Sequence, residues 1–315
     1  MPAPKQSTHL DRALSDFAVA YSQEGMFIAG QAMPVKKVKK ESDKYFTYQR
    51  KDILTIPMKT LRANGAESMR NFWDVSSSTY QCEEYSLHDF ITQRDRRNAD
   101  SPIEPEQDSV RILTEKLLLD REYRVASLMF DTSSTFSSYT AALSGGDQWD
   151  DYENSNPFAK IEDAKKSVRQ NALKVPNVII MGDDVYIKLI HHPDIKERIM
   201  YGGGPSNPAM INESNIAKLF DIPKVLIGRA VYNAANYNDT ETVSNIWGKY
   251  FGVYYIDPNP STKTVTAGVT FRAQDWQVRK WWDDDHNGDK VEISYIDDEV
   301  VPVAAAGYIY STVVS

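Results

Sequence analysis

The sequence contains little cysteine and histidine: its 315 residues include one cysteine, Cys82, and five histidines. A lone cysteine excludes an intrachain disulfide and a thiolate cluster that would hold zinc or an iron–sulfur centre. No apolar run approaches the roughly 18 residues of a membrane helix, and no signal peptide precedes the first polar residues. We therefore expect a chain that is made in the cytoplasm, has no membrane partner, and gains its stability from packing and assembly.

The sequence also lacks a recognisable catalytic motif. It has no Gly-x-Ser-x-Gly elbow, no His-Glu-x-x-His and no Cys/His pairing. The triple glycine Gly202, Gly203 and Gly204 has no preceding strand and no following Lys-Ser/Thr, so it does not predict a phosphate loop. His191 and His192 have no third ligand at metal spacing and indicate a helix end, where histidine interacts favourably with the dipole. We expect no catalysis, no metal and no cofactor.

One acidic segment matches half of a calcium loop. Asp283, Asp285, Asn287 and Gly288 follow the start of the EF-hand pattern. The closing position, which needs a bidentate glutamate, falls on Ser294, and the residues after Gly288 alternate as in a strand. A hairpin with an Asn-Gly turn explains the same residues, and we favour it.

Charge is unevenly distributed along the chain. The net charge of −8 argues against a nucleic-acid binder that relies on bulk electrostatics. Between Lys36 and Arg70, ten basic residues stand against four acidic ones, so this segment carries +6 and the remainder −14. Such a segment suits a solvated face, an anion site, or an arm that lies on an acidic neighbouring copy.

The first hundred residues predict arms and hairpins. Residues 10–21 are a short helix candidate, with Leu10, Leu14, Phe17 and Tyr21 along one face. Residues 45–58 are rich in aromatic and β-branched side chains and predict an edge strand. Asn64-Gly65 predicts a turn, after which a second limb returns through residues 72–91. A hairpin this long is marginal alone, so its tip needs a partner surface.

Residues 104–130 predict a long amphipathic helix. Pro105 fixes its start, and acidic residues lie at the positive end of its dipole. Its apolar residues fall into two stripes, one of Val110, Leu113 and Leu117, the other of Ile112, Leu119, Tyr123, Ala126 and Phe130.

The rest of the chain predicts an α/β unit and a β-rich tail. Residues 131–156 read as a polar loop, and Asn156-Pro157 starts a helix. Residues 178–181 and 225–227 are short apolar runs typical of strands buried on both faces, separated by helices that begin near Asp183, Pro193 and Asn212. Residues 265–314 alternate as strands, which we expect to form a sheet against the long helix.

Three strings and the order of the elements resemble the major capsid proteins of tailed bacteriophages, whose Hong Kong 97-type shell fold is shared with encapsulins. The strings are QCEEYSLHDFIT…RRNAD (81–100), PNVIIMGDDVYIKLIHHPDIKERI (176–199) and IAKLFDIPKVLIGRAVYN (216–233). The resemblance covers nearly the whole chain. It implies an α+β Hong Kong 97-type capsid fold with an N-terminal arm, an extended β-hairpin loop, a peripheral domain with a long spine helix, and an α/β axial domain.

The resemblance also implies domain limits. Residues 1–35 would be the N-terminal arm and 36–90 the extended loop (E-loop). Residues 91–134 and 257–315 would form the peripheral domain, with the spine helix at 104–130, and 135–256 the axial domain.

By the same resemblance, the chain is a structural subunit of an icosahedral phage capsid that encloses double-stranded DNA. Copies would form pentamers and hexamers through head-to-tail contacts around five-fold and quasi-six-fold axes, joined by E-loop and N-arm contacts. Expected partners are packaged DNA, bound non-specifically, and scaffolding, decoration and portal proteins; the location is the virion, after synthesis in the host bacterial cytoplasm. Candidate intersubunit contacts are Lys51, Lys59, Arg62, Asn64, Gly65, Gly202, Gly203 and Gly204.

Two other functions stay open. The chain could be an encapsulin-like nanocompartment subunit, or an α/β enzyme with a β-rich accessory domain, which would need a pocket with convergent polar groups. The sequence carries no long charged helical prefix, so we expect a separate scaffolding protein or none. Some capsid relatives cross-link a loop lysine to a neighbour's asparagine; Lys51 and Lys59 lie in the right region, but no motif fixes the asparagine or the catalytic glutamate, so we do not expect cross-links.

Overall fold

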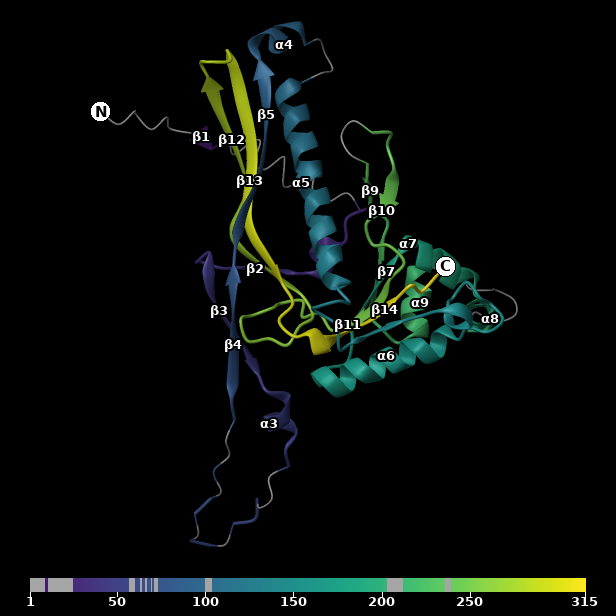
Figure 1. Cartoon of the computed structure of the whole chain (residues 1–315). Coiled ribbons are helices and arrows are strands. Elements are labelled where there is room, and N and C mark those ends of the chain that lie inside the picture. The colour runs from purple at the N-terminus through teal and green to yellow at the C-terminus, as the bar shows by residue number, and fades with distance from the viewer. Residues whose placement is uncertain are drawn as a thin grey trace.

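The computed structural model describes residues 9–10, 25–56, 60–62, 64–65, 67–68, 70, 73–99, 104–202, 212–235 and 239–315. These residues form two five-stranded sheets, two separate hairpins and a long helix, α5, that runs beside one sheet and ends against the other (Figure 1). The helices are α2 (Ala29–Ala32), α3 (Arg50–Leu54), α4 (Gln93–Asn98), α5 (Pro105–Met129), α6 (Pro157–Ala172), α7 (Asp183–His191), α8 (Pro193–Gly202) and α9 (Glu213–Leu219). In the described part of the chain, no helix is both long and apolar enough to cross a membrane.

Helix α5 confirms the predicted long helix. Pro105 occupies its first turn, Glu106 and Asp108 place negative charge at the positive end of its dipole, and Phe130 is its C-cap. The chain then reverses, because the Asp131 carboxylate accepts hydrogen bonds from the backbone N–H groups of Ser133, Ser134 and Thr135.

The two predicted stripes of α5 fare differently. Val110, Leu113 and Leu117 are buried, as predicted. In the second stripe Ala126 and Phe130 are buried, but Ile112 and Tyr123 are exposed, so the prediction was wrong for these two. Ile112 follows Val110 by two residues and therefore lies on the far side of the helix. The buried face continues instead through Leu118, Arg121, Glu122 and Val125.

The first five-stranded sheet lies along α5. Its order is β1-β12-β13-β5, and β2 also pairs with β12. The strands are β1 (His9–Leu10), β2 (Val35–Lys37), β5 (Glu83–Thr92), β12 (Val269–Asp283) and β13 (Gly288–Val300). One face packs on α5 through Val278, Val291, Ile293 and Tyr295.

The β12–β13 connection settles the calcium-loop question in favour of a turn. Asp283 pairs with Gly288 in the antiparallel ladder, and Asn287 has a φ of 54°. The Asp283 carboxylate accepts a hydrogen bond from the Asp285 N–H and forms an ion pair with Lys290, with 2.6 Å between Oδ2 and Nζ. Among the described residues no group of three or more His, Cys, Asp or Glu side chains is arranged to hold a metal.

The second sheet has the order β6-β14-β11-β7-β8. Its strands are β6 (Thr140–Ala142), β7 (Val178–Gly182), β8 (Lys224–Gly228), β11 (Phe251–Tyr254) and β14 (Gly307–Ser311). Every residue of β7 is buried, which confirms the predicted strand with two covered faces. Val178 and Ile180 face the end of α5, while Ile179 and Met181 face a core that includes side chains of α6, α7 and α9.

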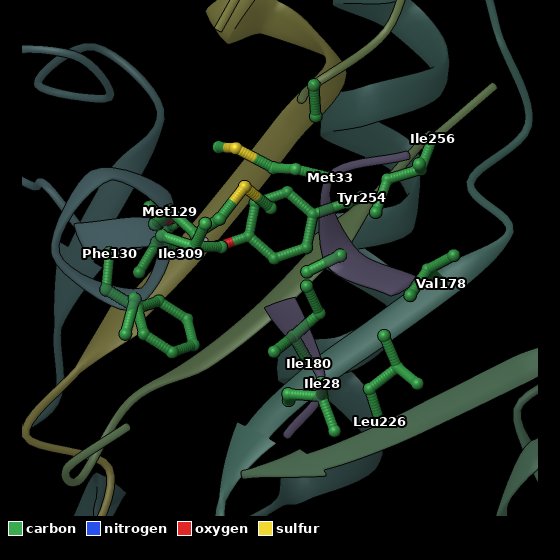
Figure 2. Close-up of a cluster of buried hydrophobic side chains, with 14 of the residues drawn as sticks. Ile28, Met33, Met129, Phe130, Val178, Ile180, Leu226, Tyr254, Ile256 and Ile309 are labelled. Atoms are coloured by element: carbon green, nitrogen blue, oxygen red, sulfur yellow. Dashed lines mark hydrogen bonds between the residues drawn. The ribbon is translucent and has the colours of Figure 1, made fainter. Parts of the chain in front are cut away.

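The end of α5 is joined to this second sheet by an apolar cluster (Figure 2). Met129 and Phe130 meet Val178, Ile180 and Ile309 there. The Tyr254 hydroxyl donates a hydrogen bond of 2.7 Å to the Met129 carbonyl. The cluster therefore fixes α5 to the second sheet.

Two glycines let a loop pass closely over this sheet. A Cβ on Gly182 would lie 1.8 Å from the Gly248 carbonyl oxygen, and one on Gly228 would lie 2.0 Å from the Trp247 ring. Only glycine is compatible with these approaches, which seat Trp247 at the ends of β7 and β8.

Four sequence expectations need correction or fall outside the described residues. The expected strand over 45–58 ends at Tyr48, because residues 50–54 form α3. The loop 131–156 contains β6 and buries Phe136, Leu143 and Trp149.

Strand β14 lies in the second sheet, not in the sheet against α5, since alternation identifies a strand but not its partner. Of the expected helix 10–21, Leu10 lies in β1 and the rest lies outside the described residues. The domain limits stay a prediction.

Candidate intersubunit surfaces

A two-stranded ribbon projects from the body of the molecule (Figure 1). Strands β3 (Ser42–Tyr48) and β4 (Val75–Gln81) pair antiparallel, from Ser42 with Gln81 to Tyr48 with Val75. Neither strand pairs with a third strand among the described residues, so each keeps an outer edge that could meet another chain. The pairing confirms the two-limbed hairpin predicted from the sequence.

The base of the ribbon is fixed to β12. Tyr80 stacks on Phe271 with 4.4 Å between ring centroids, and Tyr45 and Cys82 complete the buried cluster. The Phe46 N–H also donates to the Thr262 carbonyl. Cys82 is buried, and desolvation raises the pKa of its thiol to about 11, which disfavours the thiolate form.

Beyond this base the ribbon carries exposed apolar side chains. Ile53, Ile56 and Leu61 are 66%, 86% and 96% exposed, and Leu54, Trp73 and Val75 are also exposed. An exposed set of this size marks an interaction surface. The sequence predicted that the tip of the hairpin needs a partner surface, but it did not identify this apolar set, because Ile53, Leu54 and Ile56 were assigned to an edge strand.

The predicted loop residues lie on this same part of the ribbon. Lys51 is exposed on α3, Arg62 is exposed further along, and Asn64-Gly65 forms a turn in which Gly65 has a φ of 81°. Lys59 lies outside the described residues. The basic and the apolar residues of the ribbon therefore share one segment.

The predicted glycine contacts lie elsewhere. Gly202 is the last residue of α8, in the part of the molecule opposite the ribbon in Figure 1. Gly203 and Gly204 lie outside the described residues. Of the described residues, Gly202 thus lies away from Lys51, Arg62, Asn64 and Gly65 within one subunit.

The ribbon is also tied to helix α6. Arg50 at the start of α3 donates a hydrogen bond of 2.7 Å from Nη1 to Oδ1 of Asn171 in α6. The Asp74 N–H donates to Oδ2 of Asp52, which links the two limbs near α3. These contacts limit the directions in which the exposed segment can point.

A buried carboxylate holds three distant segments together. Glu122 of α5 accepts hydrogen bonds from the Ile28 and Ala29 N–H groups, at 2.9 and 2.8 Å, and from Nε1 of Trp247 at 2.7 Å. Desolvation raises the pKa of Glu122, and these three donors oppose that shift. The segment that leads from the N-terminus is therefore docked on the spine helix.

Ionic clusters join α5 to the neighbouring sheet at both ends of their contact. At one end Glu106 binds Lys280 at 2.8 Å and also pairs with Arg96, which in turn pairs with Asp289. At the other end, Glu299 pairs with Arg124 at 3.1 Å and with Arg121 at 3.6 Å. Apolar side chains fill the space between.

His192 proves to be a buried structural histidine at the end of α7. Its Nδ1 accepts from the Asp194 N–H, so Nε2 carries the proton and donates to Ser155 Oγ at 3.1 Å. Burial lowers the pKa of His192 and keeps the ring neutral. Its role is to hold the loop before α6, where the sequence had suggested only a favourable dipole contact.

The arrangement of an exposed ribbon, a long helix beside a sheet and an α/β unit is a fold of the Hong Kong 97 type. The structure is similar to a phage-related protein from Bordetella bronchiseptica RB50, with a TM-score of 0.74 and 19% identity over 98% of this chain and 99% of that one. It is also similar to the capsid structure of cyanophage P-SCSP1u, with a TM-score of 0.59 and 12% identity over 89% and 86% of the two chains. The predicted fold class is confirmed.

Sequence comparison points the same way. Residues 136–243 match the family described as phage major capsid protein E. The chain is 28% identical to the major capsid protein of Pseudomonas phage JBD67 over 83% of this chain and 82% of that protein. It is also 28% identical to the major capsid protein of Burkholderia phage BcepMu, over 78% and 76%. The resemblance to phage major capsid proteins that the sequence suggested is confirmed.

Proposed function

We propose that this chain is the major capsid protein of a phage, the subunit from which an icosahedral shell around double-stranded DNA is built. The observation that carries the proposal is the exposed apolar segment of the ribbon, with Ile56 and Leu61 almost fully in solvent. A monomer gains nothing from this exposure, whereas a neighbouring copy would cover it. The relatives named major capsid protein support the same function.

The ribbon is the E-loop of this proposal. Its basic residues, including Lys51, Lys59 and Arg62, would approach the acidic surface of a neighbouring copy, and its apolar residues would be buried on contact. Each such contact is modest, but a closed shell repeats it in every subunit. The triple glycine 202–204 would make a second contact, near the axes of five-fold and quasi-six-fold rings.

The other partners follow from the shell function. Packaged DNA needs little attraction from each subunit, because the closed shell confines it, so a net charge of −8 is compatible with this role. Scaffolding, decoration and portal proteins are further partners of such a shell. The subunit would act without catalysis or cofactor, and it would be made in the host bacterial cytoplasm and reside in the virion.

The test is the size of the assembled protein. The purified chain, alone and with its scaffolding protein, is measured by light scattering and negative-stain microscopy. Particles of tens of nanometres, or rings of five and six, are expected. A stable monomer or dimer under all assembly conditions would contradict the proposal. Particles that hold an enzyme cargo in place of long DNA would favour an encapsulin-like compartment.

A further inference from the structure

A shallow groove of about 640 Å³ lies beside the second sheet, where the segment before β7 meets α9 and the segment between α9 and β8. Its apolar lining is unusual for a surface, since Val175 is 67% exposed and the nearby Leu173 is exposed as well. Six of the residues that line it are Val175, Pro176, Asn177, Ala217, Ile222 and Pro223.

The rim of this groove is basic. Lys218 and Asp221 line it, Lys174 and Lys224 are exposed next to the lining residues Val175 and Pro223, and the neighbouring Glu213 is paired with Arg229. The Lys174 ammonium lies over the Tyr255 ring at 5.5 Å, a contact that limits its freedom. In a chain with a net charge of −8, an apolar groove with a positive rim selects an acidic partner that carries an apolar side chain.

The same chain offers such a partner in residues 147–154, DQWDDYEN. This loop has four acidic residues and no basic one. Of its two aromatic residues, Tyr152 is exposed. The loop is held in place by two features. Trp149 is fully buried and its backbone N–H donates to the Val313 carbonyl, and the Asp151 carboxylate accepts a hydrogen bond from the Asn154 side chain. A preformed loop loses little entropy on docking.

The groove and the acidic loop lie at opposite ends of one helix. The loop ends just before α6 begins at Pro157, and the groove begins just after α6 ends at Ala172. A helix of 16 residues is about 24 Å long, so the loop of a subunit cannot enter its own groove. Two complementary patches on opposite sides of a subunit are the requirement for a head-to-tail ring.

We propose that the acidic loop 147–154 of one subunit docks in the lysine-rimmed groove of its neighbour within each ring of the shell. This inference rests on the proposed shell function and names one of its interfaces. Tyr152 would enter the apolar groove, and the exposed Glu153 would approach Lys174 and Lys218, while Asp147 stays paired with Lys160 of its own subunit at 3.1 Å.

The test is a charge swap. One variant carries Lys174→Glu and Lys218→Glu, a second carries Glu153→Lys, and a third combines all three. Each of the first two should reduce the yield of shells about tenfold, because the weakened contact recurs in every ring. The combined variant should recover most of that yield. Val175→Asp tests the apolar part separately and should also reduce assembly.

Controls separate the alternatives. Lys166→Glu, exposed on α6, should assemble normally, and all variants should melt at the wild-type temperature because the replaced side chains lie at the surface. Wild-type chains that never form shells would refute the shell function itself. Wild-type shells together with normal assembly of the first two variants, or without recovery in the combined variant, would refute this interface alone.

Discussion

Trp247 donates a hydrogen bond of 2.7 Å from its indole Nε1 to Oε1 of Glu122, across 125 positions of sequence. Glu122 also accepts from two N–H groups at the start of α2. One carboxylate of α5 therefore connects the N-terminal segment with the loop that carries Trp247 over the second sheet. This buried carboxylate thus helps to hold the N-terminal segment, together with the pairing of β2 with β12.

Replacing Glu122 should destabilise the subunit strongly. Glu122→Ala leaves three buried donors unsatisfied, so we expect a loss of about 3 kcal/mol or more in the free energy of unfolding. Trp247→Phe removes one donor from the same carboxylate and should cost about 1 kcal/mol. Urea unfolding of the unassembled subunit measures both. Glu115→Ala, exposed on the same helix, should change stability by less than about 0.5 kcal/mol; equal effects at Glu115 and Glu122 would contradict this account.

Stability should fall in mild acid because of His192. Its pKa in the folded protein is lowered by burial, so the unfolded chain binds a proton more readily. The contribution of the neutral ring is complete above the unfolded pKa of about 6.5 and is lost as the pH falls from there towards the lower folded pKa. Unfolding measured from pH 7.5 to pH 5 should show this slope in the wild type and a smaller slope in His192→Gln. His191→Gln, the exposed neighbour, should keep the wild-type slope.

The exposed segment of the ribbon should matter for assembly and not for folding. Ile56→Ser with Leu61→Ser should leave the melting temperature of the subunit unchanged, since both side chains are already in solvent, but should reduce shell formation. The triple variant Lys51→Glu, Lys59→Glu and Arg62→Glu should likewise fold and assemble poorly. Thr60→Ser is the matched control within the same segment. Normal shells from both variants would remove the ribbon from the assembly mechanism.

Cys82 reports on the base of the ribbon. With its pKa raised to about 11 from an ordinary value near 9, it should react with a disulfide reagent about 100-fold more slowly in the folded subunit than in urea. Phe271→Ala removes the ring on which Tyr80 stacks and should cost about 3–5 kcal/mol while exposing the thiol. Thiol release followed by absorbance measures the rate. A wild-type rate in Phe271→Ala would show that the cluster does not hold the base of the ribbon.

The elements that were predictable from the sequence are those set by local rules. Helix α5 follows from Pro105, the acidic first turn and the spacing of Val110, Leu113 and Leu117. Helices α6 and α9 start where asparagine caps were expected, and the side chains of Asn156 and Asn212 accept the capping hydrogen bonds.

The features that were not predictable depend on partners far away in sequence. Nothing near Glu122 indicates that its carboxylate meets Trp247, and an acidic residue in a helix is usually solvated. The sheet that β14 joins is decided by its pairing with β11 and β6. The apolar residues of the ribbon carry no local mark that separates a buried strand from a surface that awaits another chain.

The ionic clusters at the two ends of the α5 contact have a mechanical consequence. A helix and a β-hairpin that could slide past each other would bend almost independently. Ion pairs join α5 to the hairpin at Glu106 and at Glu299, and packed side chains fill the space between. The two elements must therefore bend together, and the pair is stiffer than the two elements would be separately. A thin wall built from such pairs could resist pressure from within without being made thicker.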